Sequence, residues 1–147
     1  MLISLNSIVT AVQRFLIGTR AFTSGTLAIG TTKSKIQTTT IINYCIDGIM
    51  YVKAATDDLF VFTDVTVQPI STTRYYLLCL DATGTASIVT GTATTLPDAP
   101  AGTCPVGYVK VVTSGAGTFI PATTLLDAAQ VTETYVNLSC APAGALA

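Results

Sequence analysis

The dipeptide Asp47-Gly48 constrains the fold most strongly, because it separates two β-rich runs, residues 40–46 and 49–54. Asp-Gly between strands is typical of a two-residue type I′ turn, in which both turn residues adopt a positive φ. Such a turn also sets the register of the hairpin. The expected pairs are Ile46 with Ile49, Tyr44 with Tyr51 and Ile42 with Lys53 on one face, and Cys45 with Met50 and Asn43 with Val52 on the other. The sequence therefore predicts an antiparallel hairpin with a cross-strand tyrosine pair.

Period-two alternation recurs along most of the chain after Gly18, and this pattern is typical of β-strands. Further strands are predicted at residues 19–22, 26–29, 59–67, 74–80, 85–90, 106–112, 118–120 and 131–138. Residues 81–84 form a turn between two of these strands, and residues 56–58 and 92–102 are interpreted as loops. We therefore expect a mainly β fold, an antiparallel β-sandwich or barrel-like domain over residues 19–140, with a loose tail at 141–147.

Residues 1–18 have a helical period instead, and they predict one short N-terminal amphipathic α-helix before the β-domain. Its apolar stripe comprises Leu5, Ile8, Val9, Val12, Phe15 and Leu16. A helix this short is marginal in water, so its apolar face must dock on another surface. The pattern leaves open whether that surface belongs to the domain itself or to a partner. Our hypothesis is that the six side chains form an attachment segment that contacts neighbouring subunits.

Charge is scarce in this chain. Charged residues make up 10% of its 147 residues, and the formal net charge is −1. No basic stripe is present, so we expect no nucleic-acid binding. No uncharged apolar run of 18 or more residues is present, so we expect no membrane span. The first residues lack the basic start and the cleavage site of a signal peptide, which predicts synthesis in the cytosol. A neutral, Thr-rich surface suits contact with other subunits, because the centres of protein interfaces are depleted in charge.

The residues that usually carry catalysis are missing or poorly placed. The chain contains no histidine, which makes Ser-His and Cys-His nucleophile pairs impossible within it. Asp57 and Asp58 are adjacent and would point to opposite faces of a strand, so a solvated turn is the preferred interpretation. The run from Asp81 to Gly84 lacks the carboxylates of a calcium loop. We therefore predict that the protein is not an enzyme and has no cofactor or metal site.

Two other residue types have both structural and functional interpretations. The cysteines lack the C-x-x-C spacing of a metal site, and buried thiols are the preferred interpretation, although spacing alone leaves a disulfide open. The four are Cys45, Cys79, Cys104 and Cys140. Five of the six tyrosines are interpreted as core or interface residues, with a surface for stacking sugars or bases as the alternative. They are Tyr44, Tyr51, Tyr75, Tyr76 and Tyr108.

A series of turn and strand signatures between Lys33 and Leu138 carries a resemblance to a known group of proteins. In order, these are residues 35–40 (Lys-Ile-Gln-Thr-Thr-Thr), 44–48 (Tyr-Cys-Ile-Asp-Gly), 51–58, 76–84, 96–97 (Leu-Pro), 105–111 (Pro-Val-Gly-Tyr-Val-Lys-Val) and 118–121 (Thr-Phe-Ile-Pro), with Thr124, Leu125 and Asp127. Together they resemble small virion proteins of tailed phages, which are decoration, cement or head-fibre-like proteins. The resemblance covers about two-thirds of the chain and excludes residues 1–30.

The resemblance implies a structural role on the capsid surface, commonly as a homotrimer. Its implied partners are the major capsid protein and further copies of the chain, and its implied location is the virion, after synthesis in the host cytoplasm. The leading hypothesis is therefore a cement protein that binds the outer surface of a phage capsid and stabilises it. The alternative is a phage fibre or adhesin-like module that binds glycans, and a secreted pilin-like subunit is the third hypothesis.

Overall fold

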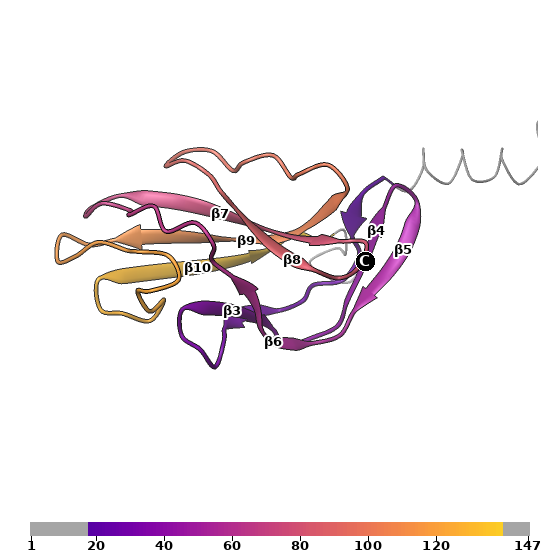
Figure 1. Ribbon diagram of the computed structural model, residues 1–147, viewed down its shortest axis with the longest axis horizontal. Helices are drawn as coiled ribbons and strands as arrows, with labels where there is room; N and C mark the ends of the chain where they lie inside the picture. The colour runs from indigo at the N-terminus through magenta and orange to yellow at the C-terminus, as the bar shows by residue number, and fades with distance from the viewer. Residues whose placement is uncertain (1–17, 140–147) are drawn as a thin grey trace, which may run out of the picture.

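The computed structural model describes residues 18–139, which form ten β-strands in three antiparallel sheets (Figure 1). The strands are β1 (Arg20–Ala21), β2 (Leu27–Ile29), β3 (Lys35–Thr38), β4 (Ile42–Ile46), β5 (Ile49–Lys53), β6 (Thr56–Val61), β7 (Thr73–Asp81), β8 (Ala86–Thr90), β9 (Thr103–Thr113) and β10 (Val131–Asn137). The mainly β fold is as predicted. Except for Gly18, the predicted N-terminal helix lies outside the described residues, and so does the predicted tail at 141–147.

Two sheets enclose the core and form a sandwich-like body (Figure 1). Their strand orders are β10-β9-β7-β8 and β2-β3-β6. Hydrogen bonds connect the two sheets on both sides: the Leu27 main-chain N–H donates to Asn137 Oδ1 at 3.3 Å, and the Thr90 hydroxyl donates to Asp64 Oδ2 at 2.8 Å. Inward side chains from both sheets form one buried cluster with Phe119, which lies between β9 and β10. From the sheets, the cluster includes Ile36, Phe60, Tyr76, Leu78, Val109 and Val111.

The third sheet, of order β1-β4-β5, lies at one end of this body (Figure 1); it is called the small sheet below. All five residue pairs predicted for the β4–β5 hairpin are formed. Asp47 and Gly48 have φ values of 50° and 82°, as a type I′ turn requires. The rings of Tyr44 and Tyr51 stack with their centroids 5.5 Å apart. The hairpin, its register and its tyrosine pair are therefore confirmed.

The bounds of β6 differ from the prediction. Residues 56–58 are the start of the strand rather than a loop, and the strand ends at Val61 instead of residue 67. Beyond the strand, the Asp64 carboxylate accepts the main-chain N–H of Thr66 at 2.8 Å. A bond of this kind from a side chain to the nearby backbone competes with strand pairing. The β-rich composition of residues 62–67 is therefore not enough to continue the strand.

Three other segments also depart from the sequence-based prediction. Strand β3 was not predicted, and it exists because it pairs with both β2 and β6. Strand β9 begins at Thr103 rather than residue 106, and it accommodates Pro105 at a register shift opposite β7, where a proline is tolerated. Residues 118–120, predicted as a strand, contribute only an isolated bridge between Gln68 and Phe119.

Candidate attachment and binding surfaces

The predicted attachment stripe cannot be placed on the β-domain. Its six side chains are Leu5, Ile8, Val9, Val12, Phe15 and Leu16, and all lie outside the described residues. The structure does place the point where that segment joins the body, because Gly18 precedes β1 in the small sheet. The chain is held there beside the β4–β5 turn, since the Asp47 main-chain N–H donates to the Thr19 hydroxyl at 3.2 Å.

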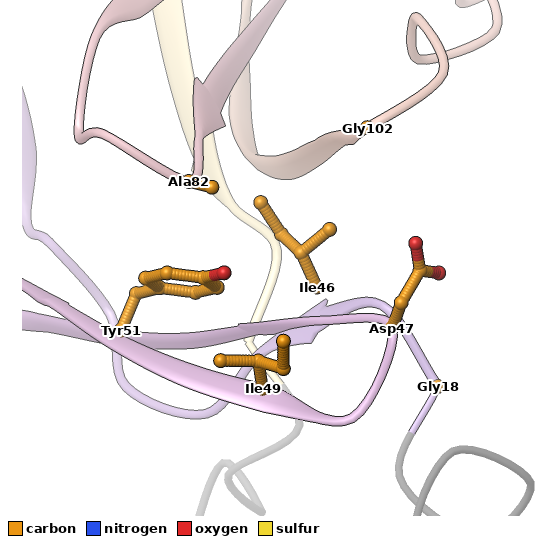
Figure 2. A pocket seen from close by; sticks show the side chains of 7 residues that line it. All are labelled: Gly18, Ile46, Asp47, Ile49, Tyr51, Ala82 and Gly102. Atoms are coloured by element: carbon orange, nitrogen blue, oxygen red, sulfur yellow. The ribbon is translucent and has the colours of Figure 1, made fainter. Parts of the chain in front are cut away.

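A pocket of about 550 Å³ opens next to Gly18 (Figure 2). Its lining residues are Gly18, Ile46, Asp47, Ile49, Tyr51, Ala82 and Gly102. In Figure 2, the side chains of Ile46 and Asp47 extend from the small sheet toward the loops that carry Ala82 and Gly102. The pocket combines aliphatic side chains with an aromatic ring and one carboxylate, a mixture that can hold either a small polar molecule or side chains of a partner.

Strand β5 exposes three large aliphatic side chains. Ile49 is 51% exposed, Met50 54% and Val52 68%. Ile41, immediately before β4, is also half exposed. Aliphatic side chains that gather on one exposed element mark an interaction surface more often than scattered ones do. A second exposed group lies at the end of β6 and after it, and comprises Val61, Val65, Val67 and Ile70.

Both ends of the described chain lie beside the small sheet. A second pocket, of about 240 Å³, is lined by residues 19–21 from the start of the chain and by Leu138 and Ser139 from its end, together with Pro105. Residues 1–17 and 140–147 therefore join the body at the same end of the fold. Among the side chains of these two segments, only Arg14 is charged.

Asp57 and Asp58 hold the loop that follows β2. The main-chain N–H groups of Thr31 and Thr32 donate to Asp57 Oδ1 at 2.9 Å and to Asp58 Oδ1 at 3.0 Å, and the Thr32 hydroxyl also bonds Asp58. Lys35 Nζ lies 3.5 Å from Asp58 Oδ2.

Because Asp58 has a φ of 52°, the carboxylates of Asp57 and Asp58 both reach the loop that follows β2. The expectation that they point to opposite faces is therefore wrong. Hydrogen bonds from Thr31 and Thr32 lower the pKa of Asp57 and Asp58, respectively.

Asp81 is a turn residue, as expected. Its Oδ1 accepts the main-chain N–H groups of Thr83 at 2.8 Å and Thr85 at 2.9 Å, and the Thr83 hydroxyl at 2.7 Å. These bonds, chiefly the one from the Thr83 side chain, lower the pKa of the Asp81 carboxyl. Across residues 18–139, no group of three or more His, Cys, Asp or Glu side chains is placed to hold a metal ion.

The tyrosines do not share one surface. Tyr44 and Tyr76 are buried in the core, as expected. Tyr75 follows the opposite face of β7 because neighbours on a strand alternate, and its ring meets that of Tyr108 edge-on, with centroids 5.8 Å apart. Tyr51 lines the pocket beside Gly18. A stacking surface built from the whole set is therefore excluded, and Tyr51 is the tyrosine that a pocket ligand would meet.

The three cysteines in the described part of the chain are buried, as the sequence led us to expect. They are Cys45, Cys79 and Cys104, whereas Cys140 lies outside the described residues. Burial raises the pKa of the Cys79 thiol, against a smaller opposing effect of a hydrogen bond with Thr103. A buried thiol of this kind acts as a small apolar side chain.

No protein-family model, curated protein or solved structure matches this chain. Residues 18–139 contain no helix that is long and apolar enough to cross a membrane.

Proposed function

We propose that this protein is a structural component of a tailed-phage virion, which binds the outer surface of the capsid and stabilises the shell. The observation that carries the proposal is the composition of the small-sheet end. Both terminal segments join the body at the small sheet, whose strand β5 exposes aliphatic side chains. A group of exposed aliphatic side chains on a charge-poor domain is suited to attachment. The resemblance to phage cement proteins supports the same role.

The proposed mechanism is adhesive rather than catalytic. The partner is the major capsid protein, and a homotrimer of this chain spans the joints between capsid subunits. Residues 1–17 supply the stripe of Leu5, Ile8, Val9, Val12, Phe15 and Leu16, and burial of each large side chain contributes roughly 1.5–3 kcal/mol. Because the protein binds only the shell state that presents its full footprint, binding stabilises that state by linkage.

Particles that lack the protein provide the test. We expect the full chain to bind them saturably and to raise the temperature at which they open. A chain that starts at Thr19 should keep a β-type circular dichroism spectrum but fail to bind. Phe15→Ser in the full chain should weaken binding, whereas Leu125→Ser, which changes a half-exposed side chain of the described body, should not. Absence of binding by the full chain would refute the proposal.

The homotrimer is tested separately. Light scattering on the purified full chain should give the mass of about three chains, because oligomers of this kind are commonly closed and symmetric. A monomer at micromolar concentration, both free and after elution from particles, would contradict the trimer while leaving capsid binding intact.

The second candidate is a fibre or adhesin-like module that binds glycans, and the pocket next to Gly18 favours it. There Tyr51 offers an aromatic ring and Asp47 a hydrogen-bond acceptor. Labelling of the protein on intact particles separates the two candidates, since a cement protein follows the capsid lattice and a fibre protein the tail. Glycan binding that is lost in Tyr51→Ala would support the second candidate.

A further inference from the structure

The chain keeps its pairing with β9 beyond the last residue of β10. The two strands pair antiparallel without a register shift from Val131–Thr113 to Asn137–Gly107. The main-chain N–H of Leu138 then donates to the Val106 carbonyl oxygen at 3.0 Å, so the same register holds one residue further. Ser139 is the last described residue, and it lines a pocket together with Pro105. The C-terminal segment therefore leaves the described body alongside the start of β9.

That register assigns a partner to the next residue, Cys140. Paired residues run in opposite directions along an antiparallel pair, so Leu138 opposite Val106 implies Cys140 opposite Cys104. Leu138 and Val106 are a hydrogen-bonded pair, and the pair two residues on is of the same type, with Cα atoms about 5.5 Å apart. Side chains of opposed residues lie on the same face. A disulfide spans Cα separations of about 4.4–6.8 Å, so the two sulfur atoms are within bonding reach.

The other two buried cysteines are less well placed. Cys79 belongs to β7, and β9 separates that strand from β10. Neighbouring strands are about 4.8 Å apart, so β7 lies roughly 10 Å from β10, too far for a disulfide. Cys45 points to the opposite face of β4 from Tyr44, because neighbours on a strand alternate. Tyr44 and Cys104 belong to one core cluster, which does not contain Cys45. The register therefore selects Cys104.

We propose that Cys104 and Cys140 are a redox pair, which is a dithiol in the cytosol and becomes an intramolecular disulfide in oxidising surroundings. The disulfide fastens the C-terminal end of the chain to β9. Cytosolic thiols are kept reduced, whereas disulfides form and persist outside the cytosol. The pair depends only on the register of β9 and β10, so it is independent of the proposed capsid role.

The oxidation proceeds by exchange with a small disulfide, oxidised glutathione. The Cys140 thiolate attacks one sulfur of that disulfide, the S–S bond breaks, and one glutathione thiolate leaves. The Cys104 thiolate then attacks the Cys140 sulfur of the mixed disulfide and releases the second glutathione. The two cysteine protons end on the two glutathione thiols, and the two electrons that the protein loses reduce the reagent. Cys104 is 0% exposed, and in this order only Cys140 meets the reagent.

The first test counts and maps thiols in the purified full chain. The reduced chain has four thiols. After exchange with oxidised glutathione the denatured protein should have two, because the disulfide uses two. Digestion with trypsin and an Asp-specific protease, without reduction, should join the Cys104 and Cys140 peptides. Asp81 and Asp98 lie between Cys79 and Cys104, so the digest separates these two cysteines. Four remaining thiols, glutathione retained on Cys140, or a disulfide to any other cysteine would overturn the proposal.

The second test uses two variants of the full chain. Cys140→Ser removes the pair, so its three thiols should remain after exchange. Cys79→Ala is the matched control, and its three thiols should fall to one. A disulfide restricts the unfolded chain, so the oxidised protein should melt at a higher temperature than the reduced protein. This difference should vanish in Cys140→Ser and persist in Cys79→Ala. An equal difference in both variants, or none in the unaltered chain, would overturn the proposal.

Discussion

The Tyr44 hydroxyl donates a 2.7 Å hydrogen bond to the main-chain carbonyl oxygen of Asp81. This bond joins the centre of the small sheet to the β7–β8 turn of the sandwich. Tyr44 is buried, and burial, followed by the nearby Asp81 carboxylate, raises the pKa of its hydroxyl. The small sheet is therefore attached to the body by a polar contact as well as by packing.

Loss of that hydroxyl should loosen the small sheet. Tyr44→Phe removes this hydrogen bond, although the Asp81 carbonyl oxygen keeps the main-chain N–H of Gly84 at 3.1 Å, and it should reduce the free energy of unfolding by about 0.5–1.5 kcal/mol. Tyr51→Phe is the matched control, because its ring stacks on Tyr44 while its hydroxyl has no hydrogen-bond partner among the described residues. Urea denaturation measures both variants. Equal stability losses would show that the bond to Asp81 contributes nothing specific.

The turn of the β4–β5 hairpin depends on residue 48 having no β-branched side chain. Gly48 has a φ of 82°, and Gly48→Val should therefore destabilise the protein by on the order of 1–3 kcal/mol through backbone strain. Gly48→Asn should cost clearly less, because asparagine tolerates this conformation. Thermal melting of the two variants provides the comparison, and similar melting temperatures would argue against strain as the cause.

Gly107 permits the close approach of β2 to the central strand β9. A Cβ atom at this position would lie 2.3 Å from Leu27 Cδ1 and 2.8 Å from the main-chain oxygen of Val136. The Leu27 tip can rotate away, but the Val136 oxygen belongs to the paired strand β10. We expect Gly107→Ala to cost about 1–3 kcal/mol in unfolding free energy. Gly115→Ala should be nearly neutral, because its Cβ would meet only Ser71 Oγ at 3.7 Å.

Gln68 is a buried polar side chain with all its main hydrogen bonds made. Its Nε2 donates to the carbonyl oxygens of Thr72 and Val111 at 3.1 and 3.0 Å, and its Oε1 accepts the Tyr76 hydroxyl at 3.2 Å. Gln68→Leu removes all three bonds, including the acceptor of the buried Tyr76 hydroxyl. The Thr72 carbonyl oxygen keeps the main-chain N–H of Thr113 at 2.9 Å, so the change should cost about 1–3 kcal/mol. Gln37→Leu should cost less, because Gln37 is half buried and makes a single side-chain bond. Denaturant titration of both variants checks the difference.

Stability should fall in acid and change little near neutrality. Hydrogen bonds from threonines lower the pKa of four carboxyls, Asp57, Asp58, Asp64 and Asp81. A carboxyl whose pKa is lowered in the folded state stabilises the protein at pH values above the pKa of the unfolded chain, about 3.9. This contribution is lost as the pH falls through the pKa of the folded state. The chain has no histidine, so the melting temperature should be nearly constant between about pH 5 and 7. Asp58→Asn should reduce the acid dependence, and a marked drop already between pH 7 and 5 would contradict this account.

Local signals account for most of what could be predicted. The Asp47-Gly48 turn and its register depend on residues that are adjacent in the chain, and the structure matches them pair by pair. The turn at Asp81 is local in the same way. The apolar stripe of the predicted N-terminal helix is also a local sequence pattern, but the surface that it would contact is formed by other residues. That part of the candidate site therefore stays a prediction.

Turn chemistry and alternation were determined by the sequence alone, because each depends on interactions within a few residues. The tertiary structure decided which segments became paired or exposed. Strand β3 is a strand only because β2 and β6 flank it. The Gln68 side chain donates a hydrogen bond to Val111 only because folding brings that distant residue next to it. The edge position of β5 follows from the order of strands in a sheet. Hydrogen bonds and burial between distant segments arise from packing, which no local pattern encodes.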